Sequence, residues 1–162
     1  MKKLLLVLVS FLLLVGCQSV ATVKPQTKNL EFTVTTTYKN TEYILYASTD
    51  EEANLNLKVK TPESLENLKL VFHEDSTYLE FLDLIKELPL NSIEEESVFR
   101  IICEGFKVAQ NTTKIYTSDD KYFIIFRFDN KNYYLYFGQT GLPLKIEGNN
   151  VEIIFKGVKI LN

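Results

Sequence analysis

The chain has 162 residues, a net charge of −3 and 46% hydrophobic residues, which suits a single domain with a real core. The mildly acidic balance argues against nucleic-acid binding and against a polybasic grip on a membrane surface, because both use clustered basic residues. Two cysteines and one histidine leave little material for a disulfide framework or a zinc site.

Residues 1–16 have the composition of an export signal. Lys2 and Lys3 precede an apolar block, Leu4–Val15, that one serine interrupts. A helix of this block would rise about 18 Å at roughly 1.5 Å per residue. That length falls short of the ~30 Å hydrocarbon core of a bilayer. We expect a signal peptide that is removed, and the alternative is an uncleaved membrane anchor.

The end of the apolar block, LVGC at 14–17, resembles the lipobox of bacterial lipoproteins. In that family the cysteine thiol receives acyl chains such as palmitate, and the polypeptide is cut before it. The resemblance implies cleavage between Gly16 and Cys17, with Cys17 as the lipid-bearing N-terminus. Two acyl chains give stable anchoring where one would be marginal. The expected location is the extracytoplasmic face of the cell membrane.

Residues 17–30 would then be the lipidated N-terminus and a flexible tether, because they are polar, contain one proline and lack periodicity. Residues 31–162 form the predicted domain. From residue 31 apolar side chains alternate with polar ones, which is typical of strands with one buried face. The alternation and the turn residues between its runs predict five strands, at 32–38, 43–49, 55–59, 68–72 and 78–84.

The period changes in residues 91–110, where apolar side chains recur at spacings of three and four. This spacing predicts one long amphipathic helix. Ser92 and Glu95 have the spacing of a capping box, so we expect the helix to begin at Ser92. Glu94 and Glu96 would lie in its first turn, where negative charge favours the helix dipole. That interpretation is preferred over an acid–base pair or a metal site.

Alternation predicts five further strands after the helix, at 113–117, 122–128, 133–137, 142–147 and 151–156. The residues 129–131 and 148–150 have the composition of hairpin turns. Several of these later strands are apolar on both faces, so both faces need a cover. The expected fold is α+β: a curved antiparallel sheet of about ten strands, an incomplete barrel, wrapped around one long helix.

This order of elements resembles the LolA/LolB-like superfamily of lipoprotein carriers. The stretch FGQTGLPLKIE at 137–147 looks like that family's Asp-x-x-Thr-Gly-x-Pro turn and following strand, and FKGV at 155–158 looks like its closing Phe-x-x-Val. Gly141 permits a positive φ and Pro143 fixes the entry to the next strand, whereas Gly138 replaces the family's aspartate. The resemblance implies a LolA-like fold and an apolar ligand.

Residues 62–72 also resemble a segment of small lipoproteins from clostridia, which are Gram-positive bacteria. That group includes a spore-germination lipoprotein with a LolA-like fold that works by binding a cell-wall amidase. This second resemblance implies a non-enzymatic lipoprotein that positions or activates an envelope protein such as a cell-wall hydrolase.

The motifs of common enzyme classes are missing from the sequence. His73 lies in an acidic turn, and Cys103 lies on an apolar segment where a thiol acts as a small hydrophobe. No His-Glu-x-x-His, Gly-x-Ser-x-Gly or phosphate-binding glycine loop occurs. We therefore expect no enzyme, no metal and no cofactor.

Aromatic residues crowd the two predicted strands at 122–128 and 133–137. They fit either a filled core with cross-strand pairs or an apolar cavity between sheet and helix that is wide enough for an acyl chain. Two hypotheses follow: an anchored lipoprotein that binds lipid in this cavity, and one that binds an envelope protein. The candidate ligand-binding residues are Phe99, Ile102, Phe106, Tyr122 and Phe126.

Overall fold

The computed structural model describes residues 23–73, 76–89, 92–93, 97–119 and 121–161. The expected signal peptide and the lipobox lie outside this part of the chain. Within it, one α-helix, α2 (Val98–Asn111), and a short 3-10 helix, η1 (Glu63–Leu65), accompany the strands. The strands are β1 (Leu30–Tyr38), β2 (Thr41–Thr49), β3 (Leu55–Thr61), β4 (Lys69–Phe72), β5 (Ser76–Phe81), β6 (Leu84–Pro89), β7 (Tyr116–Ser118), β8 (Lys121–Phe128), β9 (Lys131–Phe137), β10 (Pro143–Gly148) and β11 (Val151–Ile160).

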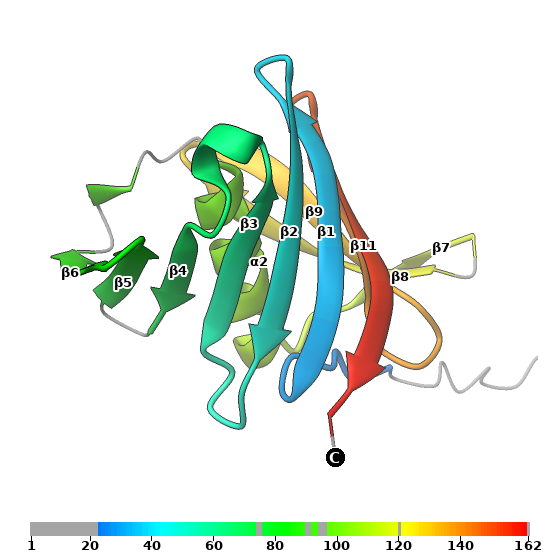
Figure 1. Cartoon of the computed structure of the whole chain (residues 1–162). Helices are drawn as coiled ribbons and strands as arrows, with labels where there is room; N and C mark the ends of the chain where they lie inside the picture. Colours follow the sequence, from blue (N-terminus) through cyan, green and yellow to red (C-terminus); the bar gives the residue numbers. More distant parts are fainter. Residues whose placement is uncertain (1–22, 74–75, 90–91, 94–96, 120, 162) are drawn as a thin grey trace, which may run out of the picture.

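The described strands form one 11-stranded sheet in the order β6-β5-β4-β3-β2-β1-β11-β10-β9-β8-β7. Each neighbouring pair is antiparallel, and the β1–β11 pair joins the two halves of the chain in the middle. The sheet stays open, with β6 and β7 at its two ends. Figure 1 shows the sheet curving so that α2 lies between its two limbs. The prediction of an open, curved antiparallel sheet is confirmed, with eleven strands in place of about ten.

The sequence prediction missed β6. It placed a single strand at 78–84, where the structure has the β5–β6 hairpin with Phe81 opposite Leu84. Leu82 makes the turn with a φ of 54° and is 81% exposed. Because Leu82 is apolar, it continues the apolar pattern of β5 through the turn. The sequence pattern therefore gave no sign that the chain reverses direction there.

The helix is shorter than predicted and begins later. Ser97 is its N-cap, and the Ser97 hydroxyl accepts a hydrogen bond from the Arg100 amide at 3.3 Å. The expectation that the helix begins at Ser92 is therefore wrong, and residues 94–96, which include the rest of the expected capping box, lie outside the described residues. Val98, the first residue of the helix, is buried, so the helix begins where its side chains start to pack on the core.

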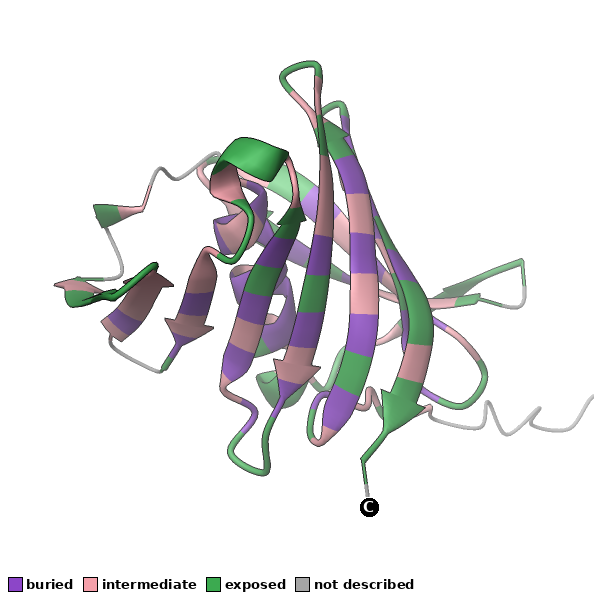
Figure 2. Ribbon diagram, in the orientation of Figure 1, coloured by how far each residue is buried: buried purple, intermediate pink, exposed green. Residues whose placement is uncertain are grey.

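The core fills the space between α2 and the inner face of the sheet. Figure 2 shows buried residues alternating with less buried ones along β1, β2 and β3, as a strand with one covered face requires. Gly105 permits the close approach of the helix, because a Cβ atom there would lie 3.1 Å from Ile146 Cδ1 and 3.2 Å from Phe126 Cζ. Next to it, Phe106 stacks on Phe32 with ring centroids 5.5 Å apart.

The turn after β9 holds the beginning of the described chain. Gly141 has a φ of +80°, as predicted, and a Cβ atom at this position would overlap the carbonyl oxygen of Lys24. The Gln26 amide donates a hydrogen bond to the Gly141 carbonyl at 2.9 Å, and Thr27 is buried. Residues 24–27 are therefore seated against the domain.

Candidate functional site

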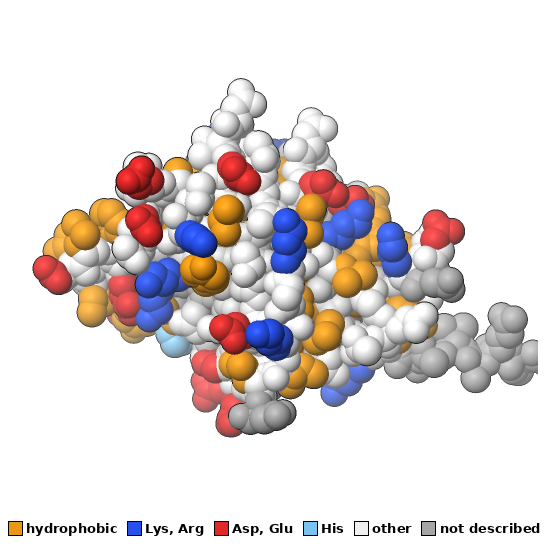
Figure 3. Space-filling view, turned by 45° about the vertical axis from the view of Figure 1, so that its right-hand side comes forward, with side chains coloured by type: hydrophobic (Ala, Val, Ile, Leu, Met, Phe, Trp, Pro, Cys, Tyr) orange, Lys and Arg blue, Asp and Glu red, His pale blue; other side chains and the backbone are white. Residues whose placement is uncertain are grey.

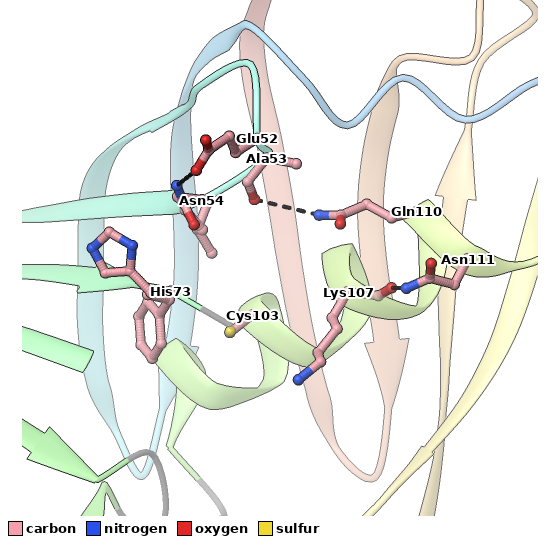
Figure 4. Close-up of a pocket in the computed structure, with 10 residues that line it drawn as sticks. Glu52, Ala53, Asn54, His73, Cys103, Lys107, Gln110 and Asn111 are labelled. Carbon is pink, nitrogen blue, oxygen red and sulfur yellow. Dashed lines mark hydrogen bonds between the residues drawn. The ribbon is translucent and has the colours of Figure 1, made fainter. Parts of the chain in front are cut away.

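A pocket of about 540 Å³ lies between α2 and the β2–β3 loop. Leu55, Phe72 and Cys103 form its buried apolar part. Figure 4 shows how the helix, the loop and the end of β4 each contribute side chains around the hollow. The remaining lining residues are Glu52, Ala53, Asn54, His73, Lys107, Gln110 and Asn111.

The β2–β3 loop is fixed by Asp50. Its carboxylate accepts hydrogen bonds from the amides of Glu52 and Asn54 and from the Asn54 side chain, each at 2.9 Å. Burial raises the pKa of Asp50, but these hydrogen bonds outweigh it, so that the pKa lies below its usual value. Residues 51 and 52 make the turn of this loop. Its role in the structure is to shape one wall of the pocket.

The end of α2 is tied to the same loop. The Gln110 side-chain amide donates to the carbonyl of Ala53 at 3.3 Å, and the Asn111 side chain donates to the carbonyl of Lys107 at 3.1 Å. Figure 4 shows both contacts as dashed lines, one from Gln110 to Ala53 and one from Asn111 to Lys107. The Gln110 hydrogen bond links the two walls of the pocket, whereas the Asn111 hydrogen bond lies within the helix end.

The two side chains that sequence analysis weighed for reactivity both line this pocket. Burial raises the pKa of the Cys103 thiol to about 12, and the neighbouring Glu104 adds to the shift. The thiol is therefore protonated at neutral pH, in keeping with its predicted role as a small hydrophobe. His73 is exposed, and its ring lies edge-on to Tyr78 with centroids 5.3 Å apart.

This arrangement is suited to binding a ligand that has both an apolar and a polar part. The apolar part of the pocket buries carbon atoms, and the amides and charged groups at the rim can hydrogen-bond a polar end. Among the described residues, no group of three or more His, Cys, Asp or Glu side chains is placed to hold a metal ion. No helix in that part of the chain has both the length and the apolar character to cross a membrane.

Three of the five residues predicted to bind a ligand lie in the filled core. Ile102, Phe106 and Phe126 are buried, and Phe126 stacks on Tyr133 with centroids 5.4 Å apart. Aromatic packing of this kind stabilises a core beyond the burial of area alone. These side chains contact other core residues and do not line the pocket described above.

The other two predicted residues are half-buried at separate places. Phe99 makes an edge contact with Tyr43, with centroids 6.1 Å apart, near the beginning of α2. Tyr122 lies at the beginning of β8, where it pairs with Phe137 of β9. The structure therefore brings Ile102 and Phe106 together on the helix but does not gather all five around one space.

Sequence analysis missed the pocket residues on the helix. Cys103, Lys107 and Gln110 are spaced by four and three, so they share one face of α2. This mixed face lies beside the apolar face that the sequence pattern identified. The spacing is a signal that could have found the helix wall, whereas the loop wall depends on how β2 and β3 are placed against it.

Comparisons with known proteins found similar folds among solved structures and no matching family model. No protein-family model matches the chain, and no curated protein matches it. Among solved structures, it is similar to the crystal structure of the LolA superfamily protein NE2245 from Nitrosomonas europaea. The TM-score is 0.47 and the sequence identity 9%, and the match covers 86% of this chain and 89% of that one. Because the score and the identity are this low, no ligand, partner or residue role is transferred from that protein.

Proposed function

We propose that this chain is a lipoprotein, anchored through Cys17 to the extracytoplasmic face of the cell membrane, whose LolA-like domain binds a lipid or another ligand with an acyl chain. The observation that supports binding is the pocket between α2 and the β2–β3 loop. Its volume of about 540 Å³ lies within the usual range of ligand sites, roughly 300–1,000 Å³. The proposal involves binding and no catalytic step.

The pocket replaces the cavity first expected from the sequence as the place for the ligand. An acyl chain would lie against Leu55, Phe72 and Cys103, and its polar end would meet the rim. The buried part is small, so we expect a short or partly exposed chain.

Native mass spectrometry of residues 24–162, purified gently from bacteria, tests ligand binding. We expect a bound species of lipid mass in the wild type and in Phe106→Leu, but not in Cys103→Phe, because the larger ring would fill the pocket. Circular dichroism checks that both variants fold. Loss of the ligand in Phe106→Leu alone would place it in the core instead. A wild type that stays empty after incubation with palmitate would refute lipid binding.

Metabolic labelling with an alkyne analogue of palmitate tests the anchor separately. In a Gram-positive host we expect the wild type to carry the label and to sediment with membranes. Cys17→Ser is expected to lose the label, whereas the control Cys103→Ser should keep it, because only Cys17 follows the lipobox pattern. Equal labelling of both variants would contradict lipidation at Cys17.

A second candidate function, partner binding, is favoured by the β5–β6 hairpin. Leu82, Leu84 and Ile85 are 81%, 72% and 73% exposed, and β6 is the last strand at its end of the sheet. Figure 3 shows hydrophobic side chains gathered at the left-hand tip of the molecule, where these strands lie. Exposed edge strands with apolar side chains are common docking sites for another protein.

A photo-crosslinking amino acid at position 85, with the same residue at position 46 as control, tests this candidate in the native envelope. Tyr46 is half-exposed on β2, far along the sheet from β6. We expect a discrete adduct with one envelope protein from position 85 only, and binding of that purified protein to the wild type but not to Ile85→Lys. Identical adducts from both positions would count against a specific partner.

A further inference from the structure

The strands β8 and β9 send aromatic rings to both faces of the sheet. The inward rings include Phe126 and Tyr133, which belong to the core. The outward rings are Phe123, Tyr134 and Tyr136, on the face that α2 does not cover. Burial of the core explains the first set only, so the outward set needs a separate explanation.

The outward rings form a cluster centred on Phe123. Tyr116 of β7 stacks on Phe123 with centroids 5.5 Å apart and an interplanar angle of 23°. Tyr136 and Tyr134 lie 5.5 and 6.1 Å from the same ring. Tyr116 is 44% exposed and the others are partly exposed, so solvent reaches this cluster. We call these four rings the outer aromatic cluster.

A hollow of about 270 Å³ lies over Phe123, Tyr134 and Tyr136. Polar side chains stand on both sides of it. Lys145 lies with its Nζ atom 5.1 Å from the centroid of the Tyr136 ring, and it pairs with Glu147. The turn between β7 and β8 supplies the other side of the rim, with Ser118, Asp119 and Lys121.

We propose that this hollow binds a neutral pyranose ring of a cell-envelope glycan. Aromatic faces carry partial negative charge and attract C–H groups, and one face of a pyranose presents C–H bonds while its hydroxyls point outward. The rim is suited to those hydroxyls, because its lysines donate hydrogen bonds and its carboxylates accept them. Among the lining residues that the structure describes, two lysines and two carboxylates also balance in charge, as suits an uncharged ligand.

The polar rim of this hollow disfavours other kinds of ligand that bind to exposed aromatic rings. The carboxylates of Asp119 and Glu147 offset the charge of the two lysines, so the rim offers no net positive charge to a phosphate-rich polymer. A lipid tail would remove the charged rim from water at a large cost in free energy.

Titration of the full chain with a soluble β-1,4-linked N-acetylglucosamine tetramer tests the proposal. The chain is purified in a detergent without a sugar headgroup, so that detergent cannot occupy the hollow. Because the chain has nine tyrosines and no tryptophan, its intrinsic fluorescence reports on tyrosine directly. We expect saturable quenching in the wild type, and binding about tenfold weaker in Tyr136→Ala, which corresponds to a stacked ring worth about 1.4 kcal/mol.

Tyr46→Ala is the matched control, because Tyr46 is 50% exposed on the outer face of β2, away from the hollow. It should bind the tetramer as the wild type does. Lys121→Ala, which removes one rim donor without removing a ring, is expected to weaken binding by a smaller factor. No saturable binding by the wild type, or an equal loss in Tyr46→Ala, would overturn the proposal and leave the rings as cross-strand pairs. This test does not involve the pocket beside α2, so its failure and that of lipid binding are distinguishable.

Discussion

Gly141→Ala is expected to detach the segment that leads into β1. Two effects act at this position. A non-glycine residue at a φ of +80° costs about 1–2 kcal/mol, and the new Cβ atom would overlap the carbonyl oxygen of Lys24. Moving residues 24–26 away would break the 2.9 Å hydrogen bond from the Gln26 amide to the Gly141 carbonyl. That bond is worth about 1 kcal/mol.

Gly157→Ala separates the two effects. Gly157 has a φ of +62°, but nothing lies within 4 Å of a Cβ atom placed there. The Gly157→Ala variant therefore carries the free-energy cost of a positive φ but no steric overlap of the new Cβ atom. Reduced entropy of the unfolded chain offsets part of that cost, by about 0.4–1 kcal/mol, in both variants. We expect a loss of about 1 kcal/mol in Gly157→Ala and about 2 kcal/mol in Gly141→Ala.

Thermal unfolding of residues 24–162 measures the difference. A domain of this size shifts its Tm by about 2–4 °C per kcal/mol, so Gly141→Ala should melt about 3 °C below Gly157→Ala. Hydrogen exchange at the Gln26 amide should accelerate in Gly141→Ala alone. Equal Tm values and unchanged exchange would refute the reasoning, because residues 24–26 would then not be seated on Gly141.

Three further predictions concern the helix and the pocket. Gly105→Ala gains about 1 kcal/mol of helix propensity, but the new Cβ atom would crowd Ile146 and Phe126, which should cost about 1–3 kcal/mol. The free energy of unfolding measured in urea should therefore decrease, and an increase would contradict the close packing. The Cys103 thiol, whose pKa is about 12, should react with a disulfide reagent at pH 8 on the order of a hundredfold more slowly in the folded chain than in urea. The pKa of Asp50 is lowered in the folded state, so its ionised carboxylate stabilises the fold above about pH 4, and this stabilisation is lost as pH falls through the folded pKa. In Asp50→Asn the free energy of unfolding should therefore fall less steeply at acid pH than in the wild type. An equally steep fall in both would show that the Asp50 hydrogen bonds do not form in solution.

The parts of the fold that were predicted from the sequence are those that local rules determine. Phe32 and Val34 are buried because alternate residues of a strand share a face, and their neighbours on β1 are polar. The hairpin after β8 turns at Asp129 and Asn130, with φ values of 47° and 57°, because these residue types tolerate positive φ. Neither feature depends on distant parts of the chain.

The pocket could not be predicted in this way, because its walls come from elements far apart in sequence. The hydrogen bond from Gln110 to Ala53 joins the end of α2 to the β2–β3 loop. The spacing of residues along one element carries no information about such a pair. For the same reason, the sequence could not distinguish the filled core around Phe106 from the cavity that was expected there.

The length of α2 explains why the β5–β6 hairpin lies beyond the part of the sheet that the helix covers. With 14 residues, α2 spans about 21 Å, whereas strands in a sheet are spaced about 4.8 Å apart. A helix of that length covers about four or five strands of an 11-stranded sheet, even when it lies across them. The ends of the sheet must then find another cover or face solvent. Leu84 and Ile85 are exposed at the β6 end. The fold leaves these apolar side chains exposed, and an exposed apolar patch is a site where a partner can bind.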